Sequence, residues 1–419
     1  MKDLKFIFYF IFNLKNSNDG LLFSKRYINK SKTQAFIKTI TLPFAILRRK
    51  HHSIEYSELK EKQWFFVYTL NQYNTIKPIY ESLNGKAVIV TNNHSLYLSS
   101  MKSIYYLDFY EAKFFLIKYP FFLISLLLIS VKDTFKYIDY FALHFGIREC
   151  AIKYLKFYKP KSIIFSNDHN PYCRAFLLGA LKMRIPSVYI QHASVSQLFP
   201  PLTFNYSLLD GKDSLNKYQK INPISGQVVL VGIPKFDQYV SLRRNIIQIN
   251  TIGIGYNTFD DIEKINELVS NLSIHFPNKK IIIRSHPSDT RKIKSENLLN
   301  VSVSDSTKQN SFEFIGNIDM LVCGDSALHL EANMLNRPCL YYRSSQSNMF
   351  DYYGYLSNNI MVYVESIESI IEFVNSYRFI SPGPFVHSKY YNEAILSDFE
   401  GHSTENIKNY LIEKLNLDA

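Results

Sequence analysis

Short, uninterrupted apolar runs recur along this chain, and each run ends in polar residues before a helical stretch begins. The first series comprises AVIVT (87–91), SIIFSND (162–168), SVYIQHA (187–193), FNYSLLD (204–210) and QVVLVG (227–232). Continuous apolar runs that alternate with helices are typical of parallel strands covered on both faces. The pattern therefore predicts a doubly wound α/β domain.

A second series of the same kind follows a polar segment at 233–250, which we expect to be a hinge. Its strands are TIGIGYN (251–257), KKIIIRSHP (279–287), IDMLVCGDS (318–326) and PCLYYR (338–343). Helices are expected at 111–157, 171–183, 260–275 and 365–377. The predicted fold is thus two tandem doubly wound, Rossmann-like α/β domains with a cleft between them. The expected divisions are a basic N-terminal region at 1–84, domains at 85–235 and 250–395, and a C-terminal helix at 396–419.

Length and charge narrow the class of protein. A chain of 419 residues suits two domains, and an apolar content of 47% excludes global disorder. Residues 1–60 hold 12 Lys and Arg against 4 Asp and Glu, so this end is strongly basic and favours an acidic partner. The four cysteines lie far apart without a CxxC pair, which disfavours a disulfide scaffold or a Cys-rich zinc site and fits the cytoplasm.

The longest apolar stretch spans residues 114–131. Lys118 and Pro120 interrupt it and leave a run beginning at Phe121 that is shorter than the roughly 18–20 residues of a membrane-spanning helix. A buried helix is the first interpretation. A helix lying against a membrane surface is the second, because the N-terminal region is basic.

Ligands of open parallel sheets bind outside the carboxyl ends of the strands. In the first domain this rule singles out Asp168 and His169 after one strand and His192 after the next. Any of these side chains is suited to remove the proton of an acceptor hydroxyl, which is the general-base step of a group transfer. Asp168 has a structural alternative, since it is also placed to cap the helix that begins at Pro171.

The same rule selects a second group of polar residues in the second domain. Tyr256 and Asn257 end one strand, and His286 with Pro287 ends the next. His286 is suited to stabilise a phosphate that gains charge as a leaving group, although a strand-end histidine is also commonly structural. Two polar rims, one in each domain, suit an enzyme that joins two substrates.

The segment CGDSALHLEANMLNRP (323–338) is the strongest local feature. Asp325 or Ser326 is placed to cap the helix that follows, where free N–H groups favour an anion, and the Ser326 hydroxyl would add a donor to a phosphate. Glu331 is placed to accept hydrogen bonds from ribose hydroxyls. The structural alternative is an ordinary helix cap and a surface glutamate.

Several other chemistries lack their motifs. GIG at 253–255 lacks the third glycine of a dinucleotide fingerprint, and neither a GxxxxGK[ST] loop nor a GxSxG elbow occurs. No DxD-type metal motif is present. We therefore expect no metal and no cofactor beyond a nucleotide-activated substrate.

Taken together, residues 160–360 resemble GT-B glycosyltransferases of bacterial surface-polysaccharide assembly. His286-Pro287 resembles the His-Pro motif of bacterial sialyltransferases and polysialyltransferases, which contacts the CMP part of the donor. GDSALHLEANMLNRPCLYY resembles their segment in which a serine meets the donor phosphate and a glutamate lies near the ribose, which correspond to Ser326 and Glu331. IPSVYIQHA resembles a stretch of capsule and teichoic-acid enzymes, including the CDP-glycerol glycerophosphotransferases, whose catalytic histidine corresponds to His192.

The resemblance implies an inverting, metal-independent transferase that moves a CMP-activated acidic sugar to a capsule or lipopolysaccharide glycan. Its expected partners are the nucleotide-activated sugar, a lipid-linked or polymeric glycan acceptor, and the inner face of the cytoplasmic membrane. The alternatives are a CDP-glycerol-type polyol-phosphate transferase and a UDP-sugar epimerase. Nucleic acid is not expected as a partner, because the basic excess lies at one end without interleaved aromatic residues.

Overall fold

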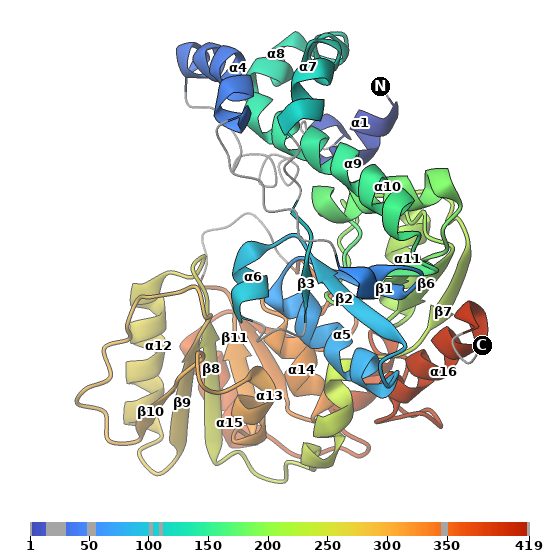
Figure 1. Cartoon of the computed structure of the whole chain (residues 1–419). Helices are drawn as coiled ribbons and strands as arrows, with labels where there is room; N and C mark the ends of the chain where they lie inside the picture. Colours follow the sequence, from blue (N-terminus) through green and yellow to red (C-terminus); the bar gives the residue numbers. More distant parts are fainter. Residues whose placement is uncertain are drawn as a thin grey trace. The chain divides into compact units, whose positions relative to one another are not determined.

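The computed structural model describes residues 2–13, 31–47, 56–99, 104–108, 112–344 and 351–416. The chain forms two compact units. Unit 1 comprises Met1–Leu209, Ser214–Leu230 and Thr404–Ala419, and unit 2 comprises Asp210–Asp213 and Val231–Ser403. Each unit is built on a parallel sheet of its own (Figure 1). This confirms the predicted fold class of two doubly wound α/β domains.

The sheet of unit 1 has seven parallel strands in the order β3-β2-β1-β4-β5-β6-β7. The strands are β1 (Gln63–Val67), β2 (Ala87–Thr91), β3 (Tyr105–Tyr106), β4 (Ser162–Phe165), β5 (Ser187–Ile190), β6 (Tyr206–Leu209) and β7 (Gln227–Leu230). Every residue of β1, β2, β4 and β5 is buried. Burial on both faces explains why these strands are continuous apolar runs and do not alternate.

The structure differs from the boundary that we expected at residue 85. Strand β1 lies before this boundary, yet it pairs with both β2 and β4 in the middle of the first sheet. Helix α5 (Leu70–Ser82), with Thr69 as its N-cap, connects β1 to β2. The region 1–84 therefore contributes a central strand to unit 1, because the short apolar run QWFFV is buried there.

The helices of unit 1 are α1 (Lys2–Ile7), α2 (Tyr9–Asn13), α4 (Lys32–Leu47), α5, α6 (His94–Ser99), α7 (Ala112–Leu127), α8 (Val131–Lys136), α9 (Ile138–Tyr158), α10 (Pro171–Met183), α11 (Lys212–Ile221) and α16 (Ser403–Leu415). Some of them pack on this sheet, whereas α4, α7 and α8 pack against one another and against α9 (Figure 1). The helical region expected at 111–157 is divided into three helices. The Ser130 hydroxyl accepts a hydrogen bond from the backbone N–H of Asp133 and so starts α8 as a separate helix.

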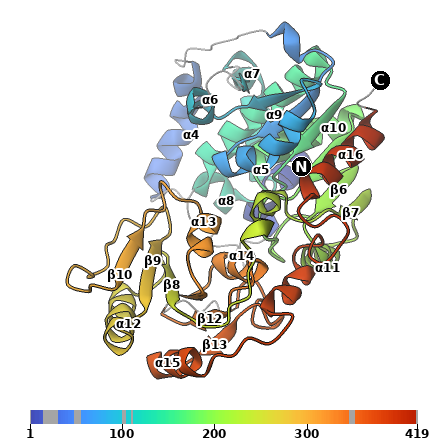
Figure 2. The same ribbon diagram turned by 90° about the horizontal axis from the view of Figure 1, so that it is seen from below.

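The sheet of unit 2 has six parallel strands in the order β10-β9-β8-β11-β12-β13. The strands are β8 (Thr251–Tyr256), β9 (Lys280–Ser285), β10 (Val301–Ser304), β11 (Met320–Cys323), β12 (Cys339–Tyr342) and β13 (Val362–Val364). Its helices are α12 (Ile262–His275), α13 (Ser311–Gly316), α14 (Leu328–Met334) and α15 (Ile367–Ser376) (Figure 2). Close packing on β8 explains why position 253 is a glycine, because a Cβ on Gly253 would lie 2.4 Å from the Ile318 side chain.

Short 3-10 helices occupy three connections. They are η1 (Ser57–Leu59), η2 (Pro234–Leu242) and η3 (Pro384–Tyr390). Helix η2 lies in the segment expected as a hinge, but this segment packs as part of unit 2. Phe236 is buried in the unit 2 core, and Arg243 donates to a carboxylate oxygen of Glu400 at 2.6 Å.

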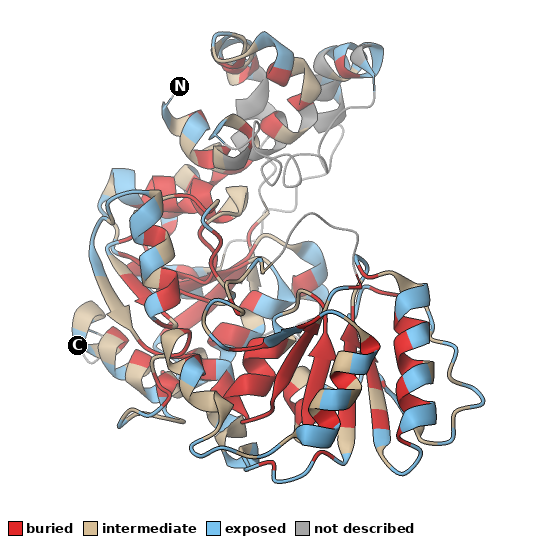
Figure 3. Cartoon of the chain, turned by 180° about the vertical axis from the view of Figure 1, so that it is seen from behind, coloured by how far each residue is buried: buried red, intermediate tan, exposed pale blue. Residues whose placement is uncertain are grey.

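The C-terminal helix expected at 396–419 is α16 (Ser403–Leu415), and its residues from Thr404 onward belong to unit 1. The Tyr410 ring lies 6.1 Å from the Tyr206 ring of β6. Buried residues concentrate along the strands of both sheets and on the helix faces turned toward them (Figure 3). Each sheet therefore has its own core, and polar side chains gather where the strands end.

Candidate functional site

Each sheet reverses its strand order at one point. In unit 1 the reversal falls between β1 and β4, and in unit 2 it falls between β8 and β11. Ligands of open α/β sheets bind outside the carboxyl ends of the strands at such a point. The loop after β4 contains Asp168 and His169, and the loops after β8 and β11 contain Asn257, Asp325 and Ser326. These five predicted site residues thus follow strands at the two switch points, whereas His192 and His286 follow the neighbouring strands β5 and β9.

In unit 1, a carboxylate and an imidazole meet directly after β4. Asp168 Oδ1 lies 2.9 Å from His169 Nδ1. Asn167 Oδ1 accepts hydrogen bonds from the backbone N–H groups of His169 and Asn170, so its Nδ2 faces His169 Nε2 at 3.3 Å. Because an amide NH₂ only donates, Nε2 is the acceptor and Nδ1 carries the proton directed at Asp168. This tautomer makes Nε2 the basic atom of His169.

Asp168 is held on both carboxylate oxygens. Its side chain is 1% exposed, and Oδ2 accepts a hydrogen bond from the Tyr218 hydroxyl at 2.5 Å. Burial, together with the neighbouring Asp168 carboxylate, raises the pKa of Tyr218, so this hydroxyl stays protonated and donates. The arrangement suits Asp168 to orient His169, whose side chain is 24% exposed, and suits His169 to take up a proton.

The helix-capping alternative for Asp168 is wrong. Asn170 is the N-cap of α10, and its Oδ1 accepts a hydrogen bond from the backbone N–H of Tyr172 at 2.8 Å. Pro171 occupies the first turn, where its missing N–H is not needed. Asp168 therefore contributes nothing to this cap and acts on His169.

The second histidine of unit 1 lies near the first. The His192 ring centroid is 6.5 Å from that of His169, and the Phe199 ring is 4.4 Å from His169. His192 follows β5, the neighbour of β4 in the sheet. The structure thus brings together all three predicted catalytic candidates, Asp168, His169 and His192, at one edge of the first sheet.

Arg174 connects this site to the N-terminal helix α1. Its buried guanidinium donates from Nη1 to the backbone oxygen of Asp168 at 2.9 Å, and it also donates to the backbone oxygen of Phe6. The guanidinium carbon lies 4.0 Å from the centre of the Phe6 ring. Burial lowers the pKa of Arg174 to about 10, which leaves the side chain charged near pH 7. Arg174 therefore holds both α1 and the loop that carries His169.

We expect Arg174→Met to lower the free energy of unfolding by about 2 kcal/mol, because each buried carbonyl left without a donor costs about 1–3 kcal/mol. The same variant should expose the N-terminal residues to protease before the rest of the chain. Urea unfolding and limited proteolysis measure the two effects. Lys156→Met on the exposed side of α9 is the matched control. Equal stability of the two variants would contradict the role given to Arg174.

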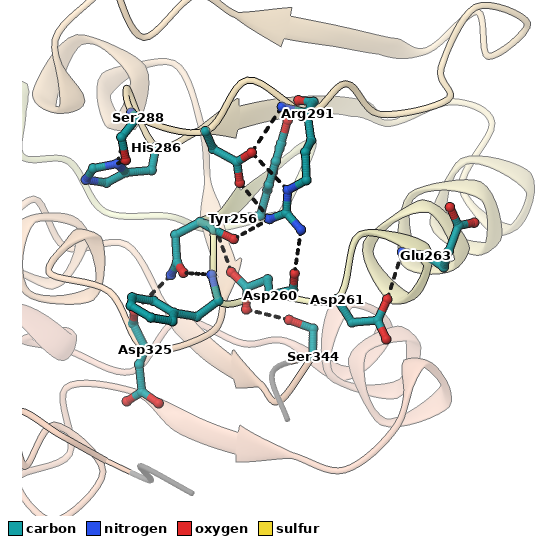
Figure 4. A network of polar contacts seen from close by, with 12 residues as sticks. Tyr256, Asp260, Asp261, Glu263, His286, Ser288, Arg291, Asp325 and Ser344 are labelled. Carbon is teal, nitrogen blue, oxygen red and sulfur yellow. Dashed lines mark hydrogen bonds and ion pairs between the residues drawn. The ribbon is translucent and has the colours of Figure 1, made fainter. Parts of the chain in front are cut away.

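In unit 2, the loop after β8 is held by a network of polar contacts (Figure 4). Asp260 accepts hydrogen bonds from the Asn257 N–H at 2.8 Å and from the Ser344 hydroxyl at 2.6 Å. Arg291, paired with Asp289 through Nε at 2.9 Å and Nη2 at 2.7 Å, donates to the backbone oxygens of Asn257 and Asp260. The loop backbone is therefore fixed from both sides.

Two of the predicted donor-binding residues belong to this network. Tyr256 is buried, and its hydroxyl donates to the backbone oxygen of Arg291 at 2.9 Å, so Tyr256 supports the loop. Asn257 Nδ2 donates to the backbone oxygen of Asp325 at 3.3 Å. Asn257 thereby joins the loops after β8 and β11, which flank the switch point of this sheet.

His286 stands exposed at the end of β9, beside β8. Its backbone N–H donates to the Tyr256 carbonyl at 2.8 Å. Its Nδ1 accepts a hydrogen bond from the backbone N–H of Ser288 at 3.2 Å, with the Ser288 hydroxyl 2.7 Å away. A neutral His286 ring therefore carries its proton on Nε2. Pro287, also exposed, follows it. His286 is thus oriented as an N–H donor, as a phosphate site requires.

The loop after β11 partly follows the prediction. Ser326 Oγ accepts a hydrogen bond from the Leu328 N–H at 3.2 Å, at the start of the seven-residue helix α14. Asp325 does not cap this helix: its carboxylate accepts from the Tyr341 hydroxyl at 2.8 Å and from the Tyr352 N–H at 3.3 Å. Burial raises the pKa of Asp325. The N-cap of α14 is Ala327, so neither expected residue caps the helix, although the Ser326 hydroxyl contacts the first helical N–H.

Glu331 is not a surface glutamate, because its side chain is 9% exposed. Its Oε1 lies 2.7 Å from the Lys235 ammonium. The second carboxylate oxygen of Glu331, Oε2, takes no part in this contact. The pair also places the Lys235 cation beside Glu331, which the sequence alone did not indicate. The expected contact of Glu331 with a ribose stays a prediction.

Sequence reasoning missed the residues that support the two sites. Tyr218 and Arg174 hold Asp168, and Arg291 with Asp289 holds the loop after β8. The two supporting residues of unit 1 lie on helices, where nothing in their local sequence marks a functional role. In unit 2, Asp289 and Arg291 lie in the polar segment Ser-Asp-Thr-Arg (288–291) directly after His286-Pro287, and this position was the local signal for them.

The described residues contain neither a membrane-spanning helix nor a cluster of metal-binding side chains. Across residues 2–13, 31–47, 56–99, 104–108, 112–344 and 351–416, no helix is long and apolar enough to cross a membrane. In the same ranges, no group of three or more His, Cys, Asp or Glu side chains is arranged to hold a metal ion. Metal independence remains a prediction.

Comparisons with known proteins support the architecture. No protein-family profile matches the chain, and no curated protein matches its sequence. Among solved structures, UDP-GlcNAc 2-epimerase from Neisseria meningitidis, bound to UDP-GlcNAc, is 14% identical, with 84% of this chain and all of that one covered, at a TM-score of 0.55. The wall teichoic acid polymerase TagF is 12% identical over 92% of this chain and 98% of its own, with a TM-score of 0.51.

A third neighbour is CalG4, the calicheamicin glycosyltransferase. It is 11% identical over 84% of this chain and 99% of its own, with a TM-score of 0.52. These similarities confirm the two-domain GT-B fold predicted from the sequence motifs. At such low identity they establish the fold alone.

Proposed function

We propose that this protein is a nucleotide-sugar-dependent glycosyltransferase that inverts the transferred sugar and needs no metal. The observation that carries the proposal is the Asp168–His169 pair at the switch point of unit 1, with Nε2 of His169 as the basic atom. An epimerase acting on its donor alone needs no acceptor hydroxyl to be deprotonated. A base oriented in this way suits a transferase.

In the proposed reaction, an acceptor hydroxyl attacks the anomeric carbon of the donor sugar. The hydroxyl proton passes to Nε2 of His169, while Asp168 stabilises the imidazolium that forms. A new glycosidic C–O bond replaces the bond between the sugar and the donor phosphate, and the nucleotide leaves with its electron pair. A single displacement of this kind inverts the anomeric centre. His192 is the second candidate base.

We propose that unit 2 binds the donor. His286 Nε2–H and the Ser326 hydroxyl would donate to the phosphate, with Pro287 fixing the backbone after His286. Asn257 and Asp325 would line the nucleotide through their loops, and Tyr256 would support them. Glu331 would accept from the ribose. The pairing of His286 with Ser288 supports this assignment, because it engages Nδ1 and leaves Nε2 as the donor.

For the donor, the His-Pro motif favours a CMP-activated acidic sugar such as sialic acid or Kdo. The acceptor would be a capsule or lipopolysaccharide glycan, reached by a peripheral enzyme at the inner face of the cytoplasmic membrane. A CDP-glycerol-type transferase is the second candidate, since the similarity to TagF extends over more of this chain than the others. The fold is also compatible with a UDP-sugar epimerase.

Thermal unfolding with a panel of CMP, CDP, UDP, GDP and ADP tests the donor site. A nucleotide at about 100 times its dissociation constant stabilises the fold by about 2.7 kcal/mol. We expect CMP or CDP to raise the melting temperature of the wild type and of His402→Ala, an exposed histidine of unit 2, but not of His286→Ala. A shift with UDP or GDP alone would discard the CMP-sugar assignment. The absence of any shift would contradict the transferase proposal.

A further inference from the structure

Helix α7 of unit 1 has two apolar faces, and only one of them is buried. Tyr119, Phe122 and Leu126 point into the unit 1 core. At the intervening positions, Ile117 and Phe121 are each 73% exposed and Ile124 is 55% exposed. Leu128, one residue past the end of α7, is also 73% exposed. The spacings of three and four residues place the exposed side chains on one stripe of the helix. An exposed apolar stripe of this length marks an interaction surface.

Helix α4, which packs against α7, α8 and α9, has a similar stripe. Ala35 is buried, whereas Phe36, Ile37, Ile40 and Phe44 are between 53% and 62% exposed. Helix α12 of unit 2 shows the usual arrangement, with buried Ile265, Leu268 and Val269, exposed Glu263, Lys264 and Glu267, and a single exposed apolar side chain, Ile274, near its end. The apolar face of α4 and α7 is therefore a local feature of these helices and not a property of the whole surface.

The charge around the two helices identifies the partner. Neither Lys32–Leu47 nor Ala112–Leu127 contains an Asp or Glu. Arg48, Arg49 and Lys50 follow α4 directly in the sequence and Lys30 lies two residues before it, whereas one acidic residue, Glu111, precedes α7. Exposed apolar side chains with cations close by in the sequence match the interface of an anionic bilayer, where apolar chains enter the acyl boundary and cations meet the headgroups. A second copy of this basic face would be repelled.

We infer that the apolar faces of α4 and α7, here called the α4–α7 face, dock this protein on an anionic lipid surface. The inference deepens the membrane contact included in the proposed function, because it assigns the contact to named side chains. From the sequence, residues 114–131 are either a buried helix or a helix at a membrane surface, and the inference combines the two. One face of α7 is buried in the core, and the other faces the lipid.

Vesicle flotation of the full chain without nucleotide tests the inference. We expect binding to phosphatidylcholine vesicles that contain about 30% phosphatidylglycerol, weaker binding to phosphatidylcholine alone, and weakening by salt. The triple variant Ile117→Ser, Phe121→Ser, Leu128→Ser should bind at least about tenfold more weakly. The matched control, Ile274→Ser, Leu299→Ser, Ile380→Ser, changes equally exposed side chains of unit 2 and should bind as the wild type does.

Tryptophan fluorescence detects the same lipid contact in a variant that is still expected to bind the vesicles. The chain contains one tryptophan, Trp64, which is fully buried and donates to the Leu59 carbonyl, so its background emission stays constant. Phe121→Trp should shift its emission to the blue on adding anionic vesicles, and Ile274→Trp should not. Equal binding of the triple variant and wild type, or an unshifted Phe121→Trp, would overturn the inference. A change from dimer to monomer in the triple variant would assign the face to a second copy instead.

Failure of this inference is distinguishable from failure of the proposed function. Nucleotide-induced stabilisation is measured without vesicles, and vesicle binding is measured without nucleotide. A protein that binds CMP but ignores anionic vesicles retains the transferase proposal and loses the α4–α7 face. The converse result retains the face alone.

Discussion

His169→Ala is expected to lower the rate of sugar transfer by about 10²–10⁴-fold at saturating donor, the usual contribution of a general base. The reason is that Nε2 of His169 is the basic atom of the pair, held in this tautomer by Asp168 and Asn167. The effect should fall on kcat, because the proton moves in the transition state. Single-turnover transfer to a glycan acceptor, with His286 intact, measures it.

Asp168→Asn is the sharper companion variant. The amide keeps the shape of Asp168 but cannot stabilise an imidazolium, so transfer should fall by a comparable factor while nucleotide binding is unchanged. His192→Ala is the parallel test of the second candidate. If His169→Ala transferred at the wild-type rate and His192→Ala were inactive, His192 would be the base.

Acid is expected to destabilise unit 2 through His329. This histidine is fully buried on α14, and its Nε2 lies 3.0 Å from the Gly324 carbonyl oxygen, to which it donates. Burial lowers the pKa of His329 to about 4, against 6.5 in the unfolded chain. The unfolded chain thus binds the proton first, so the contribution of neutral His329 is complete above pH 6.5 and is lost as the pH falls toward 4. Linkage gives a loss of about 3 kcal/mol.

His329→Gln isolates this contribution. The glutamine amide keeps a donor for the Gly324 carbonyl but does not titrate, so its unfolding free energy should lack this part of the acid loss. Urea unfolding of both proteins at several pH values from 8 to 4 measures the difference. Parallel curves for the two proteins would contradict the assignment. Because Gly324 precedes Asp325 and Ser326, weaker CMP binding in acid should accompany the change in the wild type.

The fold was predictable where local pattern and burial coincide. AVIVT, SIIF, SVYI, MLVC and CLYY each contain at least three consecutive apolar residues, and all five are strands. Strand β10 (Val301–Ser304) was missed because serine alternates with valine at the edge of its sheet, where half of its residues are exposed. Strand β1 was missed for another reason: its run is short, and only the sheet reveals that it lies at the centre.

The candidate site was predictable in position but not in role. The rule that ligands lie beyond strand ends found Asp168, His169, His192, His286 and Ser326. It could not assign separate roles to Asp168 and His169, because these depend on how the side chains are oriented: the Asn167 amide faces Nε2 of His169, and Tyr218 of α11 holds Asp168. It also gave no sign that the Asp325 carboxylate accepts a hydrogen bond from Tyr341 of β12.

The sequence by itself determined the two α/β domains, because strand and helix periodicity are local properties of neighbouring residues. It also determined which polar side chains end the strands. The tertiary structure alone decided that β1 lies at the centre of the first sheet, that Tyr218 of α11 holds one carboxylate oxygen of Asp168, and that α7 exposes a second apolar face. Each of these depends on contacts between residues distant in the chain, and burial and hydrogen bonding at such contacts have no periodicity along the sequence.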